Sequence, residues 1–212
     1  MIALISVLYQ YLYLFVATFY LKNCQCFLLM DREESRLQLF AAYTMLPGLL
    51  TGIYYFTNPE NHWIVRVAGF GYCIPCIGAY LYHRQRAYDP PDAIQKGWLR
   101  FDITCQQIGV YLPGLLTQHG LASACVASPL ILATWIGDLR HRHEVYIVGV
   151  CHALTVIIFS FCADFRCGIL SIVWFASTQV PTKYWLSLSH IIGALTVSHG
   201  YSLWNQRLLQ QM

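Results

Sequence analysis

The chain has 212 residues, of which 57% are hydrophobic and only 11% are charged, and its mean hydropathy is +0.48. A soluble domain is about 25% charged, so this composition excludes a soluble globular protein, a disordered protein and a coiled coil. The net charge of +3 is too small and too scattered for a protein that binds nucleic acid. We therefore expect an all-α polytopic transmembrane helical bundle.

Apolar runs bounded by charged residues, Pro or Gly predict eight membrane-spanning helices. A helix needs about 20 apolar residues to cross a bilayer core that is about 30 Å thick. In chain order, the predicted spans are residues 1–21, 39–57, 63–83, 101–118, 121–137, 145–163, 167–182 and 184–204. None of these runs alternates apolar and polar residues as the strands of an outer-membrane β-barrel do.

These runs predict one integral membrane domain over residues 1–212. The run over residues 1–21 lacks the basic start and the small-residue cleavage site of a signal peptide, so we interpret it as a retained anchor helix. The longest polar segments, about residues 22–38 and 84–100, are too short to fold alone. In the second span, Gly48 and Gly52 fit the small-xxx-small pattern with which membrane helices pack closely.

The distribution of basic residues predicts the orientation of the helices. Lys and Arg concentrate in cytosolic loops of membrane proteins. Three of the 13 Lys and Arg residues lie on the side that includes both termini. The other ten follow the first, third, fifth and seventh spans, and they are Lys22, Arg32, Arg36, Arg84, Arg86, Lys96, Arg100, Arg140, Arg142 and Lys183. We therefore expect a multi-pass protein with both termini outside the cytosol.

Ionisable side chains inside predicted spans are the first candidates for function, because they are costly in a membrane. His83 ends the third span, Asp102 begins the fourth, and His190 lies about two turns into the last. In the predicted orientation, all three lie toward the cytosolic ends of their helices. Two imidazoles and a carboxylate that converge there could bind Zn²⁺ or polarise a water molecule.

Four further residues could support such a site. Gln106 lies four residues after Asp102, so it shares a helical face with that carboxylate and could orient it or a substrate carbonyl. Ser187 shares the face of the last helix on which His190 lies. Arg100 could pair with Asp102 or contact a lipid phosphate, and His152 could contribute from the sixth span.

A structural interpretation competes with this functional one. His83 and Asp102 could be interfacial residues whose polar ends reach water, and His190 could hydrogen-bond between helices. Spacing alone does not separate the two interpretations.

Two segments resemble the hemolysin III, progestin/adiponectin receptor and alkaline ceramidase superfamily. The first is Ala79-Tyr-Leu-Tyr-His83, which is followed by a polar loop and by Arg100-Phe-Asp102. The second is Ser189-His190-Ile-Ile-Gly-Ala194, which is similar to the last helix of that group. The resemblance implies a core of seven helices over residues 39–204, with residues 1–21 as an additional anchor.

The resemblance also implies a zinc site in which His83 and His190 are ligands and Asp102 holds a water or orients a ligand. The chain departs from the family pattern at two positions. Ala79 stands where the family has Ser, and Leu186 stands where it has the first His of the last helix. A catalytic zinc typically has three protein ligands, so either another residue supplies the third contact or the chain is an inactive relative.

The leading functional prediction is a zinc-dependent hydrolase of lipid amide or ester bonds, with a membrane lipid as its substrate. Asp102 would then act as a general base or orienting group. The main alternative is a non-catalytic protein, either receptor-like or a scaffold subunit of a membrane assembly. Its polar residues would then only connect helices.

Two other functions would use the intramembrane histidines or broken helices. A haem protein would take its axial ligands from the intramembrane histidines, since neutral imidazoles bind haem iron. A transporter would use broken helices, for which Pro47-Gly48 and Pro113-Gly114 are the only sequence signals. The histidines available to a haem are His83, His152, His190 and His199.

Overall fold

The computed structural model describes residues 33–88, 92–115, 164–178 and 184–212, together with scattered residues between 125 and 161. Within this part of the chain, the regular structure is entirely α-helical and includes no strand. The helices are α2 (Glu33–Tyr43), α3 (Leu46–Thr57), α4 (Trp63–Ala87), α5 (Asp92–Leu115), α8 (Phe165–Ser177) and α9 (Trp185–Gln210). The predicted all-α class is therefore confirmed for the described residues.

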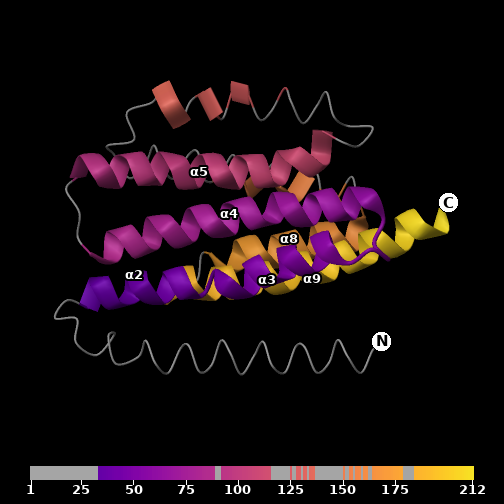
Figure 1. Cartoon of the computed structure of the whole chain (residues 1–212), viewed down its shortest axis with the longest axis horizontal. Helices are drawn as coiled ribbons and strands as arrows, with labels where there is room; N and C mark the ends of the chain where they lie inside the picture. Colours follow the sequence, from indigo (N-terminus) through magenta and orange to yellow (C-terminus); the bar gives the residue numbers. More distant parts are fainter. Residues whose placement is uncertain are drawn as a thin grey trace.

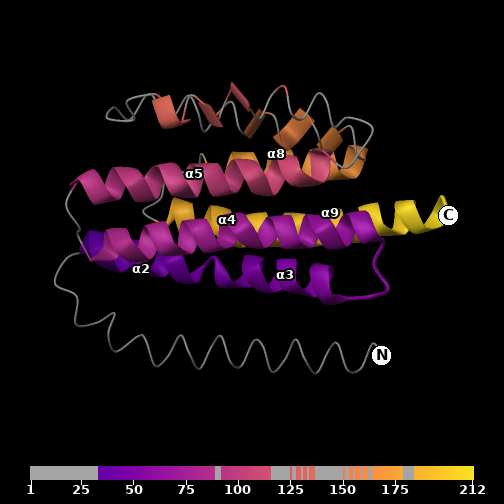
Figure 2. The same ribbon diagram turned by 45° about the horizontal axis from the view of Figure 1, so that its top comes forward.

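The described helices run along one common axis, and α4 lies at the centre of the arrangement (Figure 1). It has α5 on one side and the successive helices α2 and α3 on the other, and the rotated view in Figure 2 agrees. α9 packs against α2 and α3, and α8 packs against α9. The end of α4 that carries His83 lies beside α2 and the first turns of α9, because His83 contacts Gln38 and His190.

The helical stretch predicted as one span over residues 39–57 consists of two helices. α2 begins at Glu33, α3 ends at Thr57 as predicted, and a turn at Thr44-Met45 separates them. Proline has no N–H to donate within a helix, and it is therefore tolerated in the first turn. Pro47 occupies that place in α3.

The following helices begin and end somewhat differently from the predicted spans. α4 begins at Trp63 as predicted, and the His62 side chain caps it by accepting a hydrogen bond from the Ile64 N–H at 3.2 Å. α5 begins at Asp92 and not at residue 101, so much of the expected polar loop is helical. A hydropathy boundary marks where a helix becomes apolar, and a helix can begin well before that point.

Two helical stretches among the described residues are long and apolar enough to cross a membrane, namely Glu33–Thr57 and α4, with 25 residues each. α8 is a shorter apolar helix. Large apolar side chains lie exposed on α4, including Phe70 and Ile77, as lipid contact would allow. These features point to a membrane protein. The spans predicted over residues 1–21, 121–137 and 145–163 lie wholly or largely outside the described residues.

The contact between α3 and α4 is close because glycines face each other across it. A Cβ atom at Gly52 would lie 2.8 Å from the Gly69 carbonyl oxygen, and one at Gly69 would lie 2.8 Å from the Gly52 carbonyl oxygen. A Cβ at Gly48 would lie 2.9 Å from the Cys76 Sγ. The predicted role of Gly48 and Gly52 in close helix packing is therefore confirmed.

Candidate functional site

His83 of α4 and His190 of α9 lie together at one end of the bundle. Their ring centroids are 5.3 Å apart, and the ring planes are inclined by 51°. The His83 side chain is buried and that of His190 is half-buried. The structure thus brings together two of the three residues from which the sequence predicts a metal site.

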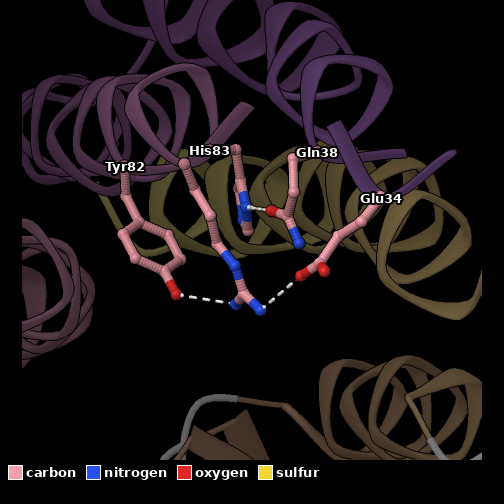
Figure 3. Close-up of polar contacts among 5 residues, drawn as sticks. Glu34, Gln38, Tyr82 and His83 are labelled. Atoms are coloured by element: carbon pink, nitrogen blue, oxygen red, sulfur yellow. Dashed lines mark hydrogen bonds and ion pairs between the residues drawn. The ribbon is translucent and has the colours of Figure 1, made fainter. Parts of the chain in front are cut away.

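The hydrogen bond made by His83 determines where its ring proton lies. The Nδ1 atom of His83 is 2.8 Å from Oε1 of Gln38, which belongs to α2 (Figure 3). An amide oxygen can only accept a hydrogen bond, so Nδ1 carries the proton and donates it. In a neutral imidazole, the other nitrogen, Nε2, then keeps a lone pair.

The same argument applies to His190. Its Nδ1 atom lies 3.0 Å from Thr44 Oγ1 and 3.2 Å from the Ala41 carbonyl oxygen. The Thr44 hydroxyl has a single proton, which it donates to the Ala41 carbonyl at 2.7 Å. Both neighbours can therefore only accept from the ring, so Nδ1 of His190 is the protonated nitrogen as well. Each histidine is thus left with an Nε2 lone pair.

A second polar group lies beside His83 at the end of α4. The Arg86 guanidinium donates to the Tyr82 hydroxyl at 3.1 Å and to Glu34 Oε1 at 3.0 Å (Figure 3). The Tyr82 ring contacts the His83 ring at a centroid distance of 4.9 Å. Glu34 and Gln38 both belong to α2, so this helix contacts α4 through two neighbouring polar pairs.

Asp102 lies on α5, where its side chain is buried. Its Oδ1 accepts a hydrogen bond from Gln106 Nε2 at 3.1 Å, so these two side chains are in contact, as their spacing of four residues predicts. Nowhere among the described residues do three or more His, Cys, Asp or Glu side chains form a group that could hold a metal ion. Asp102 is therefore not grouped with the two histidines in the described part of the chain.

The remaining predicted residues lie as follows. Ser187 is buried on α9, one turn before His190, and Arg100 is half-buried on α5. His199 is exposed on α9 and apart from the histidine pair. His152 lies outside the described residues, so its predicted contribution stays a prediction.

Sequence reasoning missed the acceptors of the two histidines, which are Gln38, the Ala41 carbonyl and Thr44. Gln38 was assigned to a loop, and a polar residue next to an apolar run is ordinary in a membrane protein. The partners lie 45 positions apart for Gln38 and His83, and 146 positions apart for Thr44 and His190. The only available signal was that Gln38 and Thr44 are polar residues at the edge of an apolar run.

No protein-family model, curated protein or solved structure matches this chain. The resemblance to the hemolysin III, receptor and ceramidase superfamily therefore stays a prediction based on the motif residues.

Proposed function

We propose that this chain is an integral membrane protein that binds zinc through Nε2 of His83 and Nε2 of His190, as a relative of zinc-dependent lipid amide and ester hydrolases. The observation that carries the proposal is the proton placement in both rings. A histidine that binds a metal almost always donates its other N–H to an oxygen acceptor. His83 and His190 both do so through Nδ1.

The separation of the two rings supports a shared metal ion. A Zn–N bond of about 2.1 Å places the imidazole centroid about 3.2 Å from the metal, so two ligands at a tetrahedral angle have centroids about 5.2 Å apart. The observed separation of 5.3 Å agrees with that value. Two imidazoles are one ligand short of a typical catalytic zinc site, so the proposal requires a third protein ligand.

A shallow apolar groove between α4 and α5 supports a lipid as the ligand or substrate. The groove has a volume of about 450 Å³ and is lined by Leu81, Gly97, Trp98 and Phe101 of α4 and α5. Leu81 lies two residues before His83 on α4, so the groove and the histidine pair lie on different faces of this helix. A hydrocarbon chain in the groove would lie along the same third of α4 as His83, and the polar part of the lipid would have to pass the end of α4 to reach the histidines.

In this proposal, each side chain has a limited role. His83 and His190 bind the metal, and a bound zinc ion would supply a water of lowered pKa and a positive charge. The Asp102 carboxylate, oriented by Gln106, lies on the neighbouring helix α5. A role for Asp102 as the general base or as an orienting group requires it to come close to the histidine pair, with which it is not grouped among the described residues.

The eight-span arrangement with both termini outside the cytosol belongs to the same proposal. It is supported by the position of Arg36 near the start of α2 and of Arg84 at the end of α4, which lie at the same end of the bundle. Cysteine substitution at Tyr88 and at Asn58 provides the test, since these residues lie at opposite ends of α4. We expect a membrane-impermeant thiol reagent added outside intact cells to label the Asn58→Cys variant above the background of the nine native cysteines, and the Tyr88→Cys variant only at that background.

Metal content tests the proposed function directly. We expect about one zinc per chain in the detergent-purified wild type and little in His83→Ala or His190→Ala, because each variant removes one ligand. His199→Ala is the matched control, since this histidine is exposed on the same helix as His190. Release of fatty acid from lipid amides and esters, with and without zinc, then tests hydrolysis. A wild type without zinc would refute the proposal.

A second candidate function is a non-catalytic membrane protein, receptor-like or a scaffold subunit, in which the same cluster connects helices. The observation that favours it is the absence of a third His, Cys, Asp or Glu beside the pair within the described residues. Hydrogen bonds between membrane helices contribute about 0.6 kcal/mol on average. In this case, the wild type would contain no zinc and His83→Ala would cost little stability.

A further inference from the structure

All the acceptors that the described structure gives to the two Nδ1 atoms come from one short segment. They are the Gln38 side chain, the Ala41 carbonyl and the Thr44 hydroxyl, and they belong to α2 and the residue that follows it. The histidines themselves belong to α4 and α9. α2 is therefore the element that determines which nitrogen of each histidine carries the proton.

The two histidines depend on α2 in different ways. His190 has two acceptors, one of which is the backbone carbonyl of Ala41. For His83, the acceptor at Nδ1 among the described residues is a single side-chain atom, Gln38 Oε1 at 2.8 Å. Loss of the Gln38 amide would therefore remove the acceptor of His83 but not that of His190.

The position of Gln38 is further defined by the ion pair one turn before it. Glu34 and Gln38 are four residues apart on α2, so they share a helical face. The Glu34 carboxylate lies 3.0 Å from Arg86, which follows His83 by three residues on α4. The same faces of α2 and α4 are thus joined twice (Figure 3). The Glu34 and Arg86 side chains are 72% and 37% exposed, so the ion pair contributes little energy. The Gln38–His83 hydrogen bond is part-buried.

We infer that Gln38 is the positioning residue of the histidine pair: its Oε1 keeps the His83 proton on Nδ1 and thereby leaves the His83 Nε2 available to a metal ion. The part of this inference that concerns zinc rests on the proposed function. Partners of this kind, in contact with a ligand but not with the metal, typically change metal affinity about 10- to 100-fold when they are removed.

The first experiment measures zinc affinity by titration of the full chain in detergent. We expect Gln38→Leu, which has a branched side chain of comparable size but no acceptor, to bind Zn²⁺ about 10- to 100-fold more weakly than the wild type. Gln38→Glu keeps an acceptor oxygen and should restore at least the wild-type affinity, which a purely structural role would not predict. Thr44→Val is the matched control, because the Ala41 carbonyl still accepts from His190. Equal affinity in Gln38→Leu and Thr44→Val would overturn the inference.

The second experiment does not require zinc. Nitrogen NMR of protein with ¹⁵N-labelled histidine separates protonated from unprotonated ring nitrogens, and loss of the signals in His83→Gln assigns them. We expect His83 to be protonated at Nδ1 in the wild type and in Gln38→Glu, but not predominantly so in Gln38→Leu. An unchanged proton position in Gln38→Leu would refute the role of Gln38. Absence of zinc from the wild type would refute the proposed function alone, since this measurement still decides the inference.

Discussion

Replacing Gly69 with alanine should force α3 and α4 apart. The new Cβ atom would lie 2.7 Å from the Phe56 nitrogen, 2.8 Å from the Gly52 carbonyl oxygen and 2.9 Å from the Tyr55 Cβ. Two of these atoms belong to the backbone and the third is fixed to it. No side-chain rotation can therefore relieve the overlap, and the helices themselves have to move.

The size of the effect follows from these distances. Ordinary contacts between heavy atoms lie at about 3.5–4.0 Å, so the helices have to separate by roughly 0.7 Å or more at this point. A gap of about 0.5–1 Å removes a quarter to a half of the dispersion energy of the contacts that it opens. Measured overpacking of this kind costs about 1–3 kcal/mol.

The matched control is Gly200→Ala on α9, where the one described atom that a Cβ would meet is the Cys167 Sγ, at an ordinary distance of 3.6 Å. Both substitutions gain the helix propensity of alanine, up to about 1 kcal/mol. The difference between the two variants therefore isolates the cost of the overlap. We expect Gly69→Ala to be about 1–3 kcal/mol less stable than Gly200→Ala.

Unfolding of detergent-solubilised protein by SDS, followed by far-ultraviolet circular dichroism, gives the two free energies. If the variants differ by less than about 0.5 kcal/mol, which is the ordinary range for substitutions away from such contacts, then α3 and α4 do not approach as closely as the glycine contacts require.

Two further predictions concern polar groups at helix ends. Asp164 caps α8 by accepting from the Arg166 N–H at 2.8 Å, and the hydrogen bond from the Arg166 side chain lowers the pKa of this carboxyl. The stabilisation of the folded state by the Asp164 carboxylate should be complete above the ordinary pKa of 3.8 and be lost as the pH falls below that value. Asp164→Asn caps the helix without titrating, so this variant should lack this pH dependence of the unfolding free energy. Glu34→Gln should lower the free energy of unfolding by at most about 1 kcal/mol, because the ion pair with Arg86 is exposed. This difference from the wild type should shrink at high salt, which screens the ion pair.

The positions of the helices could be predicted only where a local signal marks them. The start of α4 at Trp63 and the end of α3 at Thr57 were predicted correctly, because Asn58, Pro59 and Asn61 interrupt two apolar runs. The start of α5 at Asp92 was not predicted, because hydropathy treats Lys96 as part of a loop. A helix requires backbone hydrogen bonds and not apolar side chains, so its polar first turns are not visible to that signal.

The candidate site was predicted in part for a related reason. A buried ionisable residue in an apolar run is conspicuous by itself, which is why the sequence indicated His83, Asp102 and His190. Their partners are not conspicuous. Gln38 and Thr44 are common polar residues, and the contact that gives each of them a role depends on the packing of α2 against α4 and α9.

The sequence by itself determined the helical class, the apolar character and the glycine spacing of the α3–α4 contact, because each of these depends on composition or on residues a few positions apart. Only the tertiary structure decided that His83 and His190 meet, that Asp102 pairs with Gln106 and is not grouped with them, and that α2 supplies the acceptors of both rings. The physical reason is that a hydrogen bond or a metal site depends on distances of a few ångströms between atoms, and helix packing sets those distances between residues that are far apart in the sequence.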